Sequence, residues 1–121
     1  MRRDLDLARK ILLAIEASKD DEPASIRLPM REYDDLHLSH HVRLLMEAGL
    51  IHAIETHRIE PGLAWTPHML TWQGHDFLDA IRDDAVWETI KSKFADHGGD
   101  LPSDIIYEIA LDEARRKIGI A

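Results

Sequence analysis

The sequence contains no cysteine, which excludes disulfide bonds, thiolate zinc sites and catalysis by a thiol. It also has no apolar run that approaches the roughly 20 residues needed to span a bilayer. The apolar run nearest the start, Ile11 to Ile15, is short and ends at Glu16. We therefore expect no signal peptide, no membrane partner and a cytoplasmic location.

Positive charge is scarce, with 15 Lys and Arg against 23 Asp and Glu and a formal net charge of −8 at pH 7. The acidic excess is spread evenly along the chain. Non-specific affinity for nucleic acid comes mainly from Lys and Arg meeting phosphates. A chain of this composition can bind DNA only if its few cations are well placed.

Hydrophobic residues make up 45% of the 121 residues, enough for one domain with its own core. Apolar spacing and breaks predict an α+β, mostly α, winged helix-turn-helix over residues 1–82. Residues 83–121 form a helical extension in this interpretation. Helices are expected over residues 4–17, 32–48, 72–82, 84–97 and 102–121, and strands over residues 25–28, 50–57 and 65–72, the last two forming a two-stranded wing. A break near residues 37–39 would let Ser39 cap a separate helix.

Two junctions are the clearest markers of this arrangement. The first, from Glu47 to Ile51, reads as a helix end followed at once by a strand, with Gly49 free to take a positive φ. In the second, Leu70 ends the returning strand, Thr71 caps the next helix, and Gly74 allows that helix to pack closely. Together they predict a hairpin that is closed by a helix.

Longer motifs surround both junctions, namely HVxLLxEAGLI over residues 41–51 and LTWxGHDFLDAIRDDxVW over residues 70–87. With them the chain resembles an uncharacterised family of short bacterial and phage proteins, a domain of unknown function. The resemblance covers nearly the whole chain. It implies a winged-helix-like fold and a bacterial or prophage setting, and it carries over no catalytic or ligand residue.

DNA binding is the usual function of a winged helix. On this hypothesis the protein is a DNA-binding regulator, and the contacts come from His40, Arg43, Arg58, Arg2 and Arg3. The segment 31–49, which should read the bases, is itself net acidic. The alternative is a regulatory or adaptor module of phage or mobile-element origin that binds a host or phage protein. Either form could be a homodimer through the amphipathic C-terminal helix.

His37 and His41 lie four residues apart, a spacing that can chelate zinc on a continuous helix. Asp76, Asp79 and Asp83 share one helical side, as a site for acid–base chemistry would require. No nucleophile–base pair, phosphate-binding glycine loop or cofactor motif accompanies them. We therefore expect surface or core histidines, a polar helix face, no metal, no cofactor and no enzymatic activity.

The three tryptophans separate into two groups. Trp72 and Trp87 are expected to pack where the wing meets the C-terminal helices. Trp65 lies beside the turn and is the candidate for an exposed contact.

Overall fold

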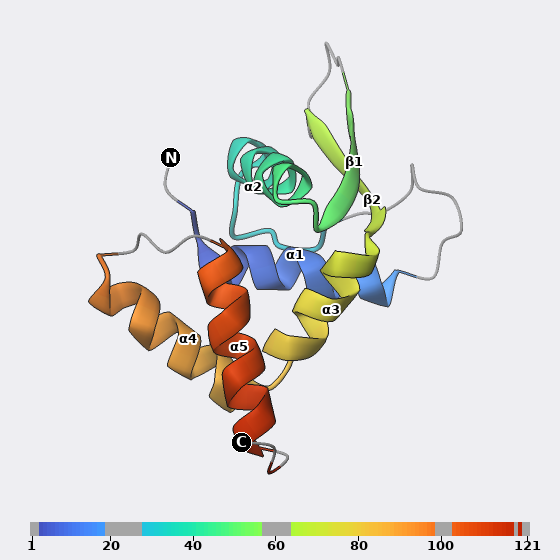
Figure 1. The fold of residues 1–121 in the computed structure, drawn as a ribbon. Helices are drawn as coiled ribbons and strands as arrows, with labels where there is room; N and C mark the ends of the chain where they lie inside the picture. The colour runs from blue at the N-terminus through green and yellow to red at the C-terminus, as the bar shows by residue number, and fades with distance from the viewer. Residues whose placement is uncertain (1–2, 19–27, 57–63, 99–102, 118, 120–121) are drawn as a thin grey trace. The chain divides into compact units, whose positions relative to one another are not determined.

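The computed structural model describes residues 3–18, 28–56, 64–98, 103–117 and 119, and it has the predicted α+β class (Figure 1). The elements in chain order are α1 (Leu5–Ala17), α2 (Asp35–Glu47), β1 (Ile51–Glu55), β2 (Trp65–Leu70), α3 (Trp72–Ile81), α4 (Asp84–Asp96) and α5 (Ser103–Lys117). The chain divides into two compact units, residues 1–75 and 76–121, with the boundary inside α3. Of the strand predicted over residues 25–28, only Leu28 lies within the described residues, and it belongs to no strand.

The first unit is built on α1, which packs against α2 and β2 (Figure 1). Asp4 is the N-cap of α1, because its Oδ1 accepts a hydrogen bond of 3.1 Å from the backbone N–H of Leu7. The core of this unit is apolar and is contributed by Leu7, Ile11, Leu12, Ile15, Met30, Leu38, Val42, Leu45, Leu50, Ile51 and Leu70. Most of these positions follow the helical spacing of the sequence.

The two strands form an antiparallel hairpin whose register changes once. Ile51 pairs with Leu70 and His52 with Met69, but Ala53 pairs with Pro67. His68 is therefore the extra residue of a β-bulge. The hairpin packs against α2, and residues 57–63 of the connection between its strands lie outside the described residues.

The end of α2 and the start of α3 are joined through one hydroxyl group. Gly49 has a φ of 76°, the left-handed conformation that the sequence predicts after the helix. The Thr71 hydroxyl donates to the carbonyl oxygen of Gly49 at 2.6 Å and accepts from the N–H of Gly74 at 2.9 Å. The N–H of Thr71 donates to the carbonyl oxygen of Leu50 at 3.0 Å. The predicted cap is confirmed, and it also closes the hairpin.

The second unit contains the later part of α3 together with α4 and α5. Asp83 caps α4 by accepting from the N–H groups of Ala85 and Val86 at 2.9 and 3.0 Å. Phe77 of α3 stacks on Tyr107 of α5, with ring centroids 5.9 Å apart. The buried apolar residues of this unit are Leu78, Ala80, Ile81, Val86, Trp87, Ile90, Ile106 and Ala110.

Gly74 permits a contact that no other residue allows. A Cβ placed on this glycine would overlap the carbonyl oxygen of Leu50 and lie 2.9 Å from its carbonyl carbon. An alanine would raise helix propensity by up to about 1 kcal/mol. Because the obstacle is backbone, we expect overpacking to dominate and Gly74→Ala to destabilise the fold by about 1–3 kcal/mol net. Urea unfolding monitored by circular dichroism measures this, and a variant at least as stable as the parent would contradict it.

The Thr71 hydroxyl should be separable from its methyl group. Thr71→Ala removes the two hydrogen bonds made by the hydroxyl, and we expect a loss of about 1–2 kcal/mol in the free energy of unfolding. Thr71→Ser keeps the hydroxyl and is the matched control, expected to unfold close to the parent. Equal losses in the two variants would show that the hydroxyl is not the stabilising group.

Candidate interaction site on α2 and the hairpin

Helix α2 is continuous from Asp35 to Glu47, so the prediction of a break near residues 37–39 is wrong. The N-cap is Asp34, whose Oδ1 accepts from the N–H of His37 at 2.8 Å. These contacts also lower the pKa of the Asp34 carboxyl, first through the backbone hydrogen bond and then through the His37 side chain. Ser39 is a buried residue inside the helix, and its hydroxyl accepts from the N–H of Ala64 at 2.9 Å. Ser39 thus ties the hairpin to α2 instead of capping a helix.

One face of α2 carries Leu36, His40, Arg43 and Glu47, spaced four, three and four residues apart. Leu36 is 69% exposed, and Arg43 and Glu47 are also exposed. The Arg43 guanidinium Nε lies 3.1 Å from Oε1 of Glu47. This exposed ion pair partly offsets the charge of Arg43, one of the five residues predicted to contact DNA.

The predicted nucleic-acid residues are only partly brought together. His40 and Arg43 share the exposed face of α2. Arg3 precedes α1 and is partly buried. Arg2 and Arg58 lie outside the described residues. The structure thus assigns two of the five to one surface.

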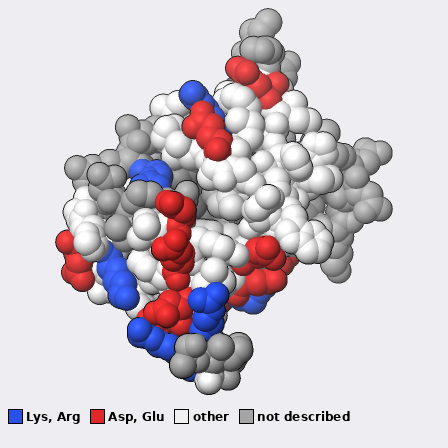
Figure 2. Space-filling model, in the orientation of Figure 1, with Lys and Arg blue, Asp and Glu red and all other residues white. Residues whose placement is uncertain are grey.

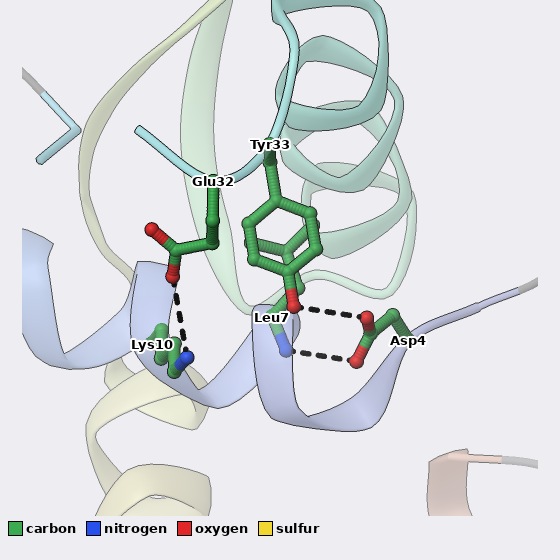
Figure 3. A network of polar contacts seen from close by, with 5 residues as sticks. All are labelled: Asp4, Leu7, Lys10, Glu32 and Tyr33. Carbon is green, nitrogen blue, oxygen red and sulfur yellow. Dashed lines mark hydrogen bonds and ion pairs between the residues drawn. The ribbon is translucent and has the colours of Figure 1, made fainter. Parts of the chain in front are cut away.

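Carboxylates accompany the cations elsewhere in the first unit. Nζ of Lys10 lies 3.4 Å from Oε1 of Glu32 and 6.0 Å from the ring centre of Tyr33, whose hydroxyl donates to Oδ2 of Asp4 at 3.1 Å (Figure 3). Burial and the Asp4 carboxylate raise the pKa of the Tyr33 phenol. On the face drawn in Figure 2, Lys and Arg form small separate groups among Asp and Glu. This view contains no continuous basic patch over the described residues.

The described part of the hairpin exposes large apolar side chains beside polar and acidic ones, among them Glu55 at the end of β1. Ile54 of β1 and Met69 of β2 are each 49% exposed, and His52, paired with Met69, is exposed beside them. Trp72, two residues after β2 ends, is 82% exposed. We call Ile54, Met69 and Trp72 the hairpin surface. Figure 2 shows a broad uncharged area where the hairpin lies.

The exposure of Trp72 shows that the predicted packing of this residue is wrong. Trp72 lies four and seven residues before Asp76 and Asp79, so it shares their solvent-facing side of α3. That spacing was readable in the sequence, but the size of the indole favoured a buried position. Trp87 is buried as predicted, and Trp65 is only partly exposed.

The two histidines considered for zinc, His37 and His41, are already engaged in hydrogen bonds. Nδ1 of His37 lies 3.0 Å from Oδ1 of Asp34. Nδ1 of His41 lies 2.9 Å from the carbonyl oxygen of His37, and Nε2 lies 2.8 Å from the backbone nitrogen of Asp4. Both ring nitrogens of His41 are thus occupied, which removes the zinc-chelating pair considered from the sequence. Across the described ranges, no group of three or more His, Asp or Glu side chains could hold a metal ion.

Within the part of the chain that the structure describes, every helix is too short or too polar to cross a membrane.

Comparisons with known proteins place the chain among similar sequences. Residues 2–100 match the model of the family described as "Hypothetical protein (DUF2513)". An uncharacterized protein of Haemophilus influenzae is 36% identical over 110 residues, which cover 91% of this chain and 92% of that protein. No solved structure matches. The family match spans most of the chain and agrees with the resemblance carried by the two long motifs, and the protein therefore belongs to the DUF2513 family.

Proposed function

We propose that this protein is a non-catalytic adaptor that binds another protein through the hairpin surface. The observation that carries the proposal is the exposure of three large apolar side chains between residues 54 and 72, with Trp72 at 82% and Ile54 and Met69 at 49% each. Large apolar side chains that cluster on a surface mark interaction sites, and tryptophan is enriched among the residues that dominate binding energy. A regulatory role, a phage or mobile-element setting and a cytoplasmic location belong to the same proposal.

The charge distribution supports a protein partner over DNA. The first unit places Arg43 against Glu47 and Lys10 against Glu32. In each pair the carboxylate partly offsets the positive charge that a phosphate backbone would meet. The three members of the hairpin surface are apolar and suit a partner with an apolar pocket, and Trp72 shares its side of α3 with Asp76 and Asp79.

The ligand expected here is a folded host or phage protein whose pocket accepts an indole ring. Trp72→Ala removes that anchor, and it should leave stability within about 0.5 kcal/mol because the side chain is exposed. Leu36→Ala is the matched control, since Leu36 is also a large exposed apolar residue but lies on α2. We expect affinity capture with quantitative mass spectrometry to find a protein retained by the parent chain and by Leu36→Ala and lost by Trp72→Ala.

Retention by Trp72→Ala with loss by Leu36→Ala would point to the α2 face, and retention by both variants or loss by both would contradict a specific role for the hairpin surface. Retention of DNA in place of any protein would favour the second candidate.

The second candidate is DNA binding by the exposed face of α2, favoured by the position of His40 and Arg43 on one helix face beside the hairpin. The Arg43–Glu47 pair allows one substitution that should strengthen DNA binding and one that should weaken it. If α2 contacts phosphates, Glu47→Gln should tighten binding by freeing the cation, and Arg43→Gln should weaken it. Fluorescence anisotropy with mixed-sequence duplex DNA at low salt measures both. Absence of binding by the parent chain and by Glu47→Gln would rule the candidate out.

A further inference from the structure

Among the buried polar or charged residues that the structure describes, His41 is the most deeply buried, with 1% of its surface exposed. It lies on the inner face of α2, one turn after His37, and its ring reaches the residue that begins α1. None of the surfaces discussed for binding uses it. Burying a titratable ring costs free energy unless its nitrogens are hydrogen-bonded.

The partners of the imidazole fix its protonation state. The carbonyl oxygen of His37 can only accept, so Nδ1 must carry the hydrogen of that 2.9 Å bond. The backbone N–H of Asp4 can only donate, so Nε2 must offer a lone pair to that 2.8 Å bond. Both hydrogen bonds are satisfied only by the neutral ring with its hydrogen on Nδ1.

The residue held by His41 is itself the start of a helix. Asp4 caps α1 through the N–H of Leu7 at 3.1 Å and receives the Tyr33 hydroxyl at 3.1 Å (Figure 3). His41 therefore accepts a hydrogen bond from the backbone of Asp4, and the side chain of the same Asp4 caps the first turn of α1. Breaking the bond to Nε2 would leave a donor of the α1 cap without its partner.

We propose that His41 is a proton-operated latch that fastens the start of α1 to α2 when the ring is neutral and releases it when Nε2 is protonated. Protonation converts Nε2 from an acceptor into a donor that faces the N–H of Asp4, and it places a cation in a buried site. Both effects weaken the contact between the start of α1 and α2. This device is independent of which ligand the hairpin surface or α2 binds.

The groups around the ring set the pH at which the latch operates. Burial is the main cause that lowers the pKa of His41 from its ordinary value of 6.5, and His40 and His37 lower it further. The hydrogen bond to the His37 backbone and the Asp4 carboxylate act in the opposite sense. Asp34 lies beside His37, and Tyr33 is bonded to Asp4 and is itself acted on by Glu32 and Asp6.

The sign of the pH dependence follows from the lowered pKa. Above pH 6.5 the ring is neutral in both the folded and the unfolded chain, and the latch contributes fully to stability. As the pH falls below 6.5, the unfolded chain takes up a proton before the folded chain does, so stability is lost. The carboxyls of Glu32 and Asp34, whose pKa values are lowered from 4.5 and 3.8, act at lower pH.

The test compares urea unfolding of the full chain at pH 7.5 and 5.5. We expect the unfolding equilibrium constant of the parent to rise by up to about tenfold per pH unit below 6.5. His41→Gln cannot be protonated at this position, so the part of this rise that comes from His41 should be absent. His75→Gln, at an exposed histidine of α3, is the control and should keep the pH dependence that comes from His41. An unchanged pH dependence in His41→Gln would overturn the proposal.

A second measurement on the parent chain keeps the proposal falsifiable if His41→Gln does not fold. Nuclear magnetic resonance of the ring nitrogens should find His41 with its hydrogen on Nδ1 near neutral pH. The amide signal of Asp4 should then shift with the titration of that ring below pH 6.5. A hydrogen on Nε2, or an Asp4 amide that does not respond when the ring titrates, would exclude the latch.

Discussion

The first unit depends on the hydroxyl of Thr71, because it satisfies backbone groups from two separate elements at once. It donates to the carbonyl of Gly49, two residues after α2 ends, and it accepts from the N–H of Gly74, which has no partner within α3. A helix end and a helix start thus meet at one side chain, with the hairpin as the loop between them. The close approach of Gly74 to Leu50 follows from the same meeting. The hairpin therefore leaves and returns at a fixed point beside α2.

The two junctions around the hairpin were predictable because each depends on a local rule. A positive φ at Gly49 and a cap at Thr71 follow from residue type and position alone. The roles of Ser39 and His41 depend on partners 25 and 37 residues away, Ala64 and Asp4, which no local pattern encodes. Ser39 reads locally as a cap, and only tertiary structure shows it inside a helix. The α+β class was thus predictable, and the contacts that hold α2 in place were not.

The candidate site shows a similar division between composition and placement. The sequence indicates an acidic chain with few cations, and the structure pairs five of them with carboxylates, including Lys10 and Arg43. Exposed apolar side chains lie on the hairpin and at the start of α3. The size of Trp72 predicts packing where the wing meets the C-terminal helices, whereas its side of α3, shared with Asp76 and Asp79, indicates solvent. The periodicity of α3 was the better guide to this residue.

The bulge at His68 changes which residues of β2 can serve the core. Side chains of a regular strand alternate between faces, so Pro67 and Leu70, three residues apart, would point in opposite directions. The extra residue shifts the phase once, and both are buried while Met69 between them is exposed. The strand therefore has two segments whose side-chain alternation differs by one residue. Packing against the core fixes which residues face inward at the base of the hairpin. It does not fix which residues face inward in the outer half, beyond the bulge.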